Sequence, residues 1–279
     1  MNSAIILIIL SFIAFFSACS MQNVESMPIV TEQNPAAKDQ NKDQKKQPVL
    51  IELYTSEGCS SCPPADKALA FLEKEQPYMQ AEIITLALHV DYWDRLGWKD
   101  EFSSPLYSQR QTVYAQKLKL DSTYTPQMIV DGHTQFVGSN LSEAGKAITE
   151  AAKSPKANIE AAFNNENTLQ IKIFAVPKHE AATVFLAIAE DNLSSNVKRG
   201  ENTGKNLEHI SVVRELKAIG KIEANSDRFE QEAAFTLKPE WKKENLKYVI
   251  FVQENESRRI LGIKTALEQS ESKLLLNNR

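Results

Sequence analysis

Two cysteines, Cys59 and Cys62, lie where a strand pattern gives way to a helix pattern. The preceding run Val49–Thr55 is short and apolar, which is typical of a buried strand. Pro63 and Pro64 are compatible with a first helical turn, because N–H groups there have no intrahelical partner. Apolar residues then recur at helical spacing, namely Ala65, Ala68, Leu69 and Leu72. The segment therefore predicts a strand, a tight loop with a Cys-x-x-Cys motif, and a helix.

The position of the motif at the start of a helix affects the reactivity of its two cysteines. Unpaired N–H groups and the positive end of the helix dipole lie at a helix N-terminus, and both favour a thiolate over a thiol. We expect Cys59 to be the attacking nucleophile, and Cys62, one turn farther in and more buried, to resolve the mixed disulfide. The carboxylates of Glu57 and Asp66 oppose a thiolate, so the pKa of the thiols is left open.

The following segments continue the alternation of strands and helices. Strands are expected at Ile83–Val90, Gln127–Gly132 and Thr134–Val137, and helices at Pro105–Leu118 and from a cap at Asn140 or Ser142 to about Lys153. The order βαβαββα is that of the thioredoxin fold, an α/β fold. That fold has a cis-proline just before its third strand, where this chain has Thr125 and Pro126.

In such a sheet the first two strands are parallel and the third is antiparallel to them. The carboxyl ends of the first two strands therefore share an edge with the amino end of the third. Cys59, the loop from His89 to Trp98, and Pro126 all fall on that edge. Ligands of open α/β sheets bind beyond the carboxyl ends of the strands, so we expect the functional site there.

Four motifs in this order resemble the DUF1223 family: GCSSCPPADKAL, HVDYWDRLGWKDEFSSP, YTPQMIVDG and VGSN. The later stretch VKRGENTGKNLEHISVVREL resembles it too, so the resemblance runs from about Val49 to Ala266. It implies a secreted protein with a thioredoxin-like domain and an appended β-rich part. By resemblance to thioredoxin-like proteins, Pro126 would let a substrate chain pair with Thr125 and would discourage metal capture by the thiols.

Aromatic residues are dense in the segment after His89. Tyr92, Trp93 and Trp98 could wall a groove for a peptide or an apolar ligand, or could pack a long loop onto the domain. His89 could shuttle a proton for the thiols, or could be hydrogen-bonded at a strand end.

The cysteine pair itself has three interpretations, which are reversible dithiol–disulfide exchange, a structural disulfide and a pair of inert thiols. Structural zinc needs four ligands, and the sequence has no second cysteine pair. Copper(I) fits better, because two thiolates and His89 would suit a soft cation. We expect no resident metal or cofactor, and no phosphate-binding glycine motif occurs.

From Ala157 onward the pattern changes to short strands separated by turn residues, which favours an antiparallel, sandwich-like β-rich domain. Strands are expected around Leu169–Ile173 and at Ala182–Ala189, Phe229–Leu237, Tyr248–Gln253 and Arg259–Lys264. The polar stretch Lys198–Glu208 could cover the active edge of the first domain. We favour the alternative, a long exposed hairpin connection.

The apolar run Ala4–Phe16 is shorter than the hydrocarbon core of a bilayer and fits the h-region of a secretory signal. It leads into Ser17, Ala18 and Cys19, which resemble a bacterial lipobox and imply a lipid on Cys19. An ordinary signal peptide cut nearby and an uncleaved anchor are the alternatives. Polar residues 20–48 have the composition of a flexible tether.

The predicted organisation is a signal peptide at residues 1–18, a lipidated tether at 19–48, a thioredoxin-like domain at 49–154 and a β-rich domain at 155–279. We expect a thiol–disulfide oxidoreductase-like protein, lipid-anchored in the cell envelope and facing the periplasm, or secreted if not lipidated. The alternatives are a copper(I)- or peptide-binding lipoprotein and a non-catalytic structural disulfide. Expected partners are a protein or small-thiol substrate, a redox partner and a membrane, but no nucleic acid, since the net charge is −4.

Overall fold

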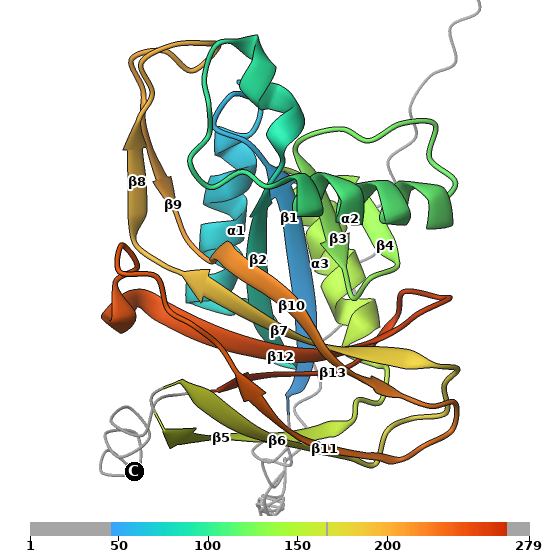
Figure 1. Ribbon diagram of the computed structural model, residues 1–279. Helices are drawn as coiled ribbons and strands as arrows, with labels where there is room; N and C mark the ends of the chain where they lie inside the picture. Colours follow the sequence, from blue (N-terminus) through green and yellow to red (C-terminus); the bar gives the residue numbers. More distant parts are fainter. Residues whose placement is uncertain (1–45, 166, 267–279) are drawn as a thin grey trace, which may run out of the picture. The chain divides into compact units, whose positions relative to one another are not determined.

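The computed structural model describes residues 46–165 and 167–266 (Figure 1). Cys19 and the predicted signal and tether up to residue 45 lie outside these residues. The described strands form an eight-stranded sheet in the order β13-β12-β7-β10-β2-β1-β3-β4, a three-stranded sheet β11-β6-β5, and the hairpin β8-β9. Within the described part, no helix is long and apolar enough to cross a membrane.

The first half supplies one end of the large sheet. Its strands are β1 (Gln47–Thr55), β2 (Ala81–His89), β3 (Gln127–Val130) and β4 (Thr134–Val137). As predicted, β2 runs parallel to β1 and β3 runs antiparallel to it. The helices are α1 (Pro63–Glu75), the 3-10 helix η1 (Asp91–Leu96), α2 (Pro105–Lys117) and α3 (Leu141–Ala151). Asn140, and not Ser142, caps α3, since its side chain accepts a hydrogen bond from the Glu143 N–H at 3.2 Å.

The second half is mainly antiparallel. Its elements are β5 (Asn158–Asn165), β6 (Thr168–Phe174), β7 (Ala182–Glu190), β8 (Leu193–Asn196), β9 (Asn206–His209), β10 (Val212–Ile222), β11 (Arg228–Ala234), η2 (Lys243–Asn245), β12 (Leu246–Glu254) and β13 (Ile260–Ala266). The sequence analysis named no strand at β5, β8, β9 or β10. A core cluster joins the three-stranded sheet to the second-half strands of the large sheet, which gives this part its layered packing.

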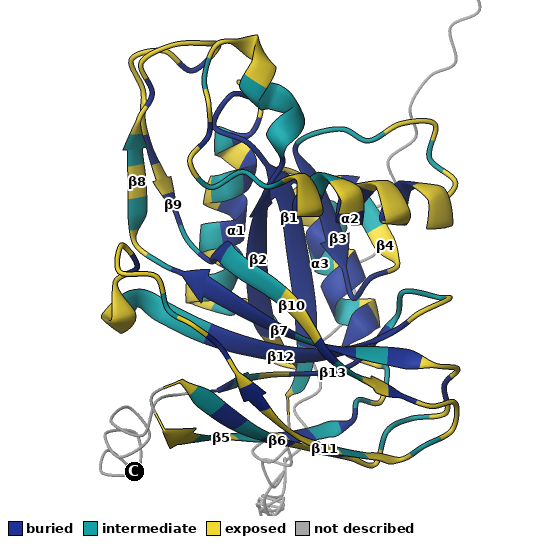
Figure 2. Ribbon diagram, viewed as in Figure 1, coloured by how far each residue is buried: buried dark blue, intermediate teal, exposed yellow. Residues whose placement is uncertain are grey.

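Alternate residues of β1 face different core clusters, as the pleat of a strand requires. Ile51 and Leu53 pack toward α1 and α3, whereas Leu50 and Tyr54 pack with Tyr114 of α2 and with residues of β7 and β12. Figure 2 shows β1 and β2 buried along most of their length. The strands that position the cysteines are therefore covered on both faces.

A buried ion pair joins α2 to β1. The Arg110 Nε donates to Glu52 Oε1 at 2.6 Å, and the hydroxyl of Tyr114 donates to Glu52 Oε2 at 2.5 Å. The guanidinium also lies over the rings of Phe185 and Phe251, at 5.3 and 5.5 Å from their centroids. These contacts compensate the desolvation of both charges and hold α2 against strands from both halves of the chain.

The two halves share the large sheet through β10, which runs parallel to β2 over a short register at Val212 and Ala87. The Ala87 N–H donates to the Ser211 carbonyl at 2.8 Å, and the hydroxyls of Thr85 and Ser211 lie 2.7 Å apart. The Lys247 ammonium donates to Ser211 Oγ at 2.7 Å and extends the contact to β12. Because β9 precedes β10 directly, this joint also fixes where the β8–β9 hairpin lies.

Candidate functional site

Cys59 and Cys62 form a disulfide at the start of α1, with their Cα atoms 5.4 Å apart. Cys62 is the N-cap residue of α1, and its carbonyl accepts hydrogen bonds from the Ala65 N–H at 2.8 Å and the Asp66 N–H at 3.1 Å. We predicted that Cys62 would be the more buried of the two. Both cysteines are instead 0% exposed, so exposure does not distinguish a nucleophile from a resolving residue in this oxidised state.

The loop between β8 and β9 lies over the Cys-x-x-Cys motif. The side-chain amide of Asn202 donates to the carbonyls of Glu57 at 2.8 Å and Cys59 at 2.9 Å, and Asn202 is itself 0% exposed. The Ser60 N–H donates to Glu201 Oε2 at 3.0 Å. The segment 198–208 is a mostly exposed hairpin connection, as the preferred sequence interpretation had it, but its tip also covers the disulfide loop, as in the alternative. The tip is anchored there by polar contacts that carry no periodic signal.

The Lys205 ammonium holds the other end of the Asn202 side chain, since it donates to Asn202 Oδ1 at 2.8 Å. The amide of Asn202 is thus oriented by a donor on one side and two acceptors on the other. This arrangement fixes which side of the amide faces the cysteines. We refer to residues 197–205 as the cover loop.

The predicted aromatic residues bind the loops together. Trp93 Nε1 donates to Thr125 Oγ1 at 2.8 Å, and Trp98 Nε1 donates to Glu57 Oε2 at 2.7 Å. Gly58 packs against Trp93, whose Cβ would lie 3.2 Å from a Cβ added at that position. The hydroxyl of Tyr92 donates to Gln111 Oε1 at 3.2 Å, toward α2. The side chains of both tryptophans thus clamp the Cys-x-x-Cys loop.

Pro126 lies close to the first turn of α1. The Thr125–Pro126 bond is cis, as predicted. The Pro126 carbonyl accepts a hydrogen bond from the Gly138 N–H at 3.0 Å. A Cβ added to Gly138 would lie 3.4 Å from Pro126 Cβ and 3.1 Å from Ala65 Cβ, so only glycine fits between the two segments. The structure therefore brings the cysteines, η1 and Pro126 to one edge of the sheet.

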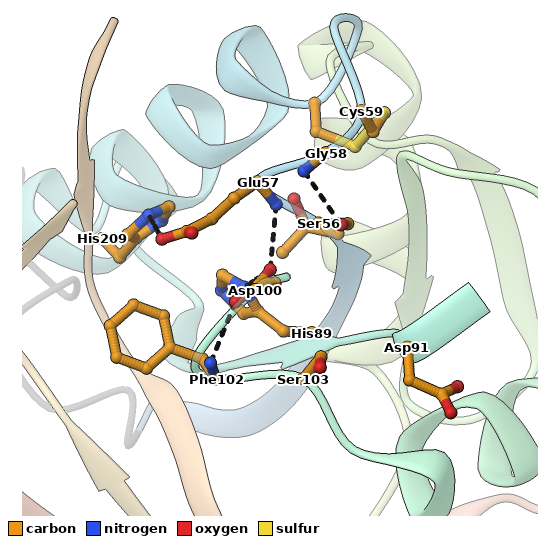
Figure 3. Close-up of polar contacts among 12 residues, drawn as sticks. Ser56, Glu57, Gly58, Cys59, His89, Asp91, Asp100, Phe102, Ser103 and His209 are labelled. Atoms are coloured by element: carbon orange, nitrogen blue, oxygen red, sulfur yellow. Dashed lines mark hydrogen bonds and ion pairs between the residues drawn. A yellow bond between two sulfur atoms is a disulfide. The ribbon is translucent and has the colours of Figure 1, made fainter. Parts of the chain in front are cut away.

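A buried polar cluster lies beside the disulfide loop (Figure 3). His89 Nδ1 is 2.7 Å from Asp100 Oδ2, and the same carboxylate oxygen accepts the Glu57 N–H at 2.9 Å. Glu57 Oε1 lies 3.2 Å from Nε2 of His209, a close polar contact whose alignment is poor for a hydrogen bond. The rings of His89 and His209 meet edge to face, with their centroids 5.0 Å apart. The cluster therefore links the Cys-x-x-Cys loop to β9.

The sequence interpretation missed His209, Asp100 and Asn202. For His209 a weak signal exists, because the pattern of β9 alternates between exposed and buried residues and puts Leu207 and His209 on one face. Asp100 and Asn202 belong to loops, where no periodicity marks a buried residue. Their roles come from contacts between segments far apart in the sequence.

Burial and charge act against each other in this cluster. Burial is the largest single effect and disfavours the protonated ring of His89. The carboxylates of Asp100, Asp66 and Glu57 together outweigh it and raise the pKa of His89 above its ordinary value of 6.5. Burial likewise disfavours ionised Asp100, but His89 and hydrogen bonds lower the pKa of Asp100. Burial raises the pKa of Asp66, whose carboxyl accepts a hydrogen bond from Thr55 Oγ1 at 2.8 Å. The site thus keeps an ion pair and a weakened acid next to the disulfide loop.

Metal ligation has little geometric support at this site. Among residues 46–165 and 167–266, no group of three or more His, Cys, Asp or Glu side chains is arranged to hold a metal ion. Nδ1 of His89 already contacts Asp100. A copper ion would therefore require His89 to bind through Nε2 and both cysteines to be reduced.

Comparisons with known proteins place the chain among proteins of similar sequence and fold. The family described as "protein of unknown function (DUF1223)" matches residues 50–253. A crystal structure of a protein from Agrobacterium tumefaciens matches with a TM-score of 0.63 and 23% sequence identity, over 81% of this chain and 96% of that chain. At this identity the similarity establishes the fold alone. The search of curated proteins found no match.

Substitution of Asn202 by alanine should make the disulfide more accessible. The change removes two buried hydrogen bonds to the disulfide loop, each worth about 1 kcal/mol, so we expect dithiothreitol to reduce the disulfide roughly thirtyfold faster. The rate of thiol release measures the effect. Thr203→Ala on the exposed side of the same loop is the matched control, and equal rates in the two variants would contradict the role of Asn202.

The His89–Asp100 pair should make stability depend on pH. Because the pKa of His89 is raised on folding, its stabilising contribution is complete below about pH 6.5 and is lost as pH rises through the folded-state pKa. In Asp100→Asn the carboxylate is gone while burial remains, so the pKa of His89 should fall. Ring resonances followed by NMR would measure it, and an unchanged midpoint would refute the pairing.

Proposed function

The chain belongs to the DUF1223 family, and we propose that this member is a thiol–disulfide oxidoreductase of the cell envelope that works through Cys59 and Cys62. The observation that carries the proposal is the disulfide at the N-terminus of α1, on the same sheet edge as the cis Thr125–Pro126 bond. Reversible disulfides need a position that favours a thiolate after reduction, and a helix N-terminus supplies it.

The topology around the cysteines supports a thioredoxin-like arrangement of the first half. The parallel strands β1 and β2 are connected through α1. The strand β3 then runs antiparallel to β1, and β4 runs antiparallel to β3. The helix α3 comes next and packs on the same side as α1. In this arrangement the Cys-x-x-Cys motif and the cis-proline face a common substrate, although they are far apart in sequence.

The proposed exchange begins from the oxidised pair. A substrate thiolate attacks Sγ of Cys59, the Cys59–Cys62 bond breaks, and Cys62 leaves as a thiolate. The second thiolate of the substrate then attacks the sulfur of its own mixed disulfide and releases Cys59. Two electrons pass from the substrate dithiol to the protein, and the two thiolates formed on the protein take up the two protons that the substrate loses. The reverse sequence, with Cys59 attacking, reduces a substrate disulfide.

Polar groups next to the motif can take part in these proton movements. Asp66, one turn beyond Cys62, has a pKa raised by burial, and a weakened acid holds a proton more readily than an exposed aspartate. The positive end of the α1 dipole favours the thiolates. The N–H groups of the first turn do not contribute, because Pro63 and Pro64 have none and those of Ala65 and Asp66 donate to the Cys62 carbonyl. We assign His89 a positioning role, because its pairing with Asp100 also holds the oxygen that accepts the Glu57 N–H.

A structural disulfide is the second candidate, and the complete burial of both cysteines favours it. The two functions differ in reduction potential. Labile pairs lie above roughly −300 mV and structural pairs below it. The measured potential of the Cys59–Cys62 pair therefore decides between them.

The proposed cellular location rests on the N-terminal sequence. An apolar run of signal-peptide length, followed by Ser17, Ala18 and Cys19, supports export and lipidation at Cys19. The polar residues between Cys19 and β1 would then tether the folded part to the membrane surface on the periplasmic side. An oxidising compartment of this kind allows a two-cysteine motif to form a disulfide.

Substitution of Cys62 by serine should trap a mixed disulfide on Cys59. With the resolving thiol gone, a dithiol or disulfide substrate should stay attached, because no internal thiol can release it. Mass spectrometry of the chain after reaction with oxidised glutathione measures the adduct. The matched variant Cys59→Ser should carry at least tenfold less adduct. Absence of any adduct, together with a reduction potential of the Cys59–Cys62 pair below roughly −300 mV, would rule out the proposed function.

Substitution of Cys19 by serine should release the protein from membranes. Lipidation needs the cysteine thiol, and a single serine removes the attachment site without changing the apolar run. Fractionation of cells into membrane and soluble pools measures the change. An equal membrane share for Cys19→Ser and for the control Ser20→Ala would contradict a lipid anchor.

A further inference from the structure

A groove lies between α1 and the β8–β9 hairpin, next to the disulfide. Its volume is about 1050 Å³. One wall is formed by residues of α1 such as Pro63, Lys67 and Lys74, and the other by Leu207 and Glu208 of β9. Ser60, inside the Cys-x-x-Cys motif, lines the end near the disulfide. No residue of β8 lines the groove, which is consistent with Figure 1, where β9 lies between β8 and α1.

The groove wall formed by β9 is a free strand edge. At the hairpin tip the Val197 N–H donates to the Lys205 carbonyl at 3.0 Å, and the Val197 carbonyl accepts the Gly204 N–H at 2.8 Å. Val197 is therefore a hydrogen-bonded position, opposite a bulge formed by Gly204 and Lys205. In an antiparallel ladder hydrogen-bonded positions alternate with non-hydrogen-bonded ones. Asn206, opposite Asn196, and Glu208, opposite Ser194, are therefore non-hydrogen-bonded positions. The backbone N–H and C=O groups of Asn206 and Glu208 point away from β8, toward the groove.

We propose that this edge binds an extended, cysteine-containing segment of a protein substrate, which adds as a third strand to β9 and runs along the groove to the disulfide. Exposed strand edges recruit extended chains through main-chain hydrogen bonds, with pockets for alternate side chains. The inference rests on the proposed function and names its substrate class. It places the main strand-pairing contact at β9.

The charges at the groove select among such segments. Lys67, Lys74 and Lys205 are exposed at its walls, whereas the acidic groups there are Asp66, which is partly buried with a raised pKa, and Glu208. The positive groups outnumber the negative ones, so acidic side chains flanking the substrate cysteine complement the groove. The preferred ligand is therefore an extended segment with acidic flanks.

The same hairpin connects the groove to the covered disulfide. Lys205 lines the groove and donates to Asn202, which holds the carbonyl of Cys59. A substrate strand paired with β9 would come close to this lysine, and an acidic flank would compete for its ammonium group. Loss of the Lys205 contact removes one of the bonds that orient Asn202 over Cys59. Binding in the groove and uncovering of the disulfide are thus mechanically linked.

A peptide that can form a strand provides the test. The probe is acetyl-Glu-Val-Thr-Cys-Thr-Val-Glu-amide, and its partner is the same peptide with N-methyl groups on alternate residues, which block strand pairing. We expect the first peptide to open the disulfide of the oxidised full chain, by forming a mixed disulfide with Cys59 and releasing the Cys62 thiol, at least tenfold faster than the N-methylated one. Rates are compared with that of dithiothreitol on the same protein, so that differences in thiol access cancel. A thiol-free version with serine in place of cysteine, labelled with fluorescein, measures binding by anisotropy.

Two proline variants of one hairpin give the matched comparison. Glu208→Pro removes an N–H that points into the groove, whereas Ser194→Pro removes the equivalent N–H on the opposite edge, away from it. Proline is tolerated where a strand N–H points outward, so both hairpins keep their own ladder bonds. In Glu208→Pro the ratio of the peptide rate to the dithiothreitol rate should fall about tenfold. In Ser194→Pro this ratio should stay within twofold.

A charge-reversal variant tests the groove without changing the backbone. In Lys67→Glu with Lys74→Glu, binding of the serine peptide with acidic ends should weaken at least fivefold more than that of a peptide with glutamine ends. Equal reaction of the plain and N-methylated peptides, or an equal effect of the two prolines, overturns the groove proposal while leaving the oxidoreductase proposal intact. If neither the peptide nor dithiothreitol opens the disulfide, the oxidoreductase proposal fails, and this inference fails with it.

Discussion

The short parallel contact between β10 and β2 is the constraint on which the site depends. Ser211 accepts the Ala87 N–H through its carbonyl and contacts Thr85 through its hydroxyl, so β10 is attached at one point of the edge of β2. The residues just before β10 form β9, which therefore runs beside α1. A contact of a few residues thus brings the cover loop to the cysteines, more than 130 positions earlier in the chain.

Because of that joint, charged groups from both halves share one poorly solvated region. Glu57 faces His209 on one side and, through its backbone N–H, Asp100 on the other. Each carboxylate contacts a histidine, a tryptophan N–H or a backbone N–H. These contacts lower the free-energy cost of burying several titratable groups together. Each member of the cluster is needed, because removing one leaves its partner buried without a compensating contact.

The parts of this structure that follow from local pattern could be predicted from the sequence. The apolar period of α1 and the strands β1 to β4 belong to this class, whereas the cis bond at Pro126 was predicted from the likeness of their order to the thioredoxin fold. The cover loop does not, because Asn202 is buried by two carbonyl contacts and not by apolar packing. The strand β10 was also missed, since its half-exposed, lysine-containing sequence has only a few fully buried positions. Both misses concern long-range polar or edge contacts, which leave no period in the sequence.

A disulfide covered by a loop can still react with a protein substrate if binding of that substrate in the neighbouring groove moves the loop. A permanently exposed pair would exchange with any small thiol in its compartment, whereas a covered pair exchanges only after the loop over it moves. A few hydrogen bonds centred on Asn202 hold the loop in place. Breaking them costs free energy, which the binding of a strand along β9 can offset. Selectivity would then come from the backbone edge of the hairpin, and the chemistry from the helix N-terminus, two features that the β10–β2 joint holds side by side.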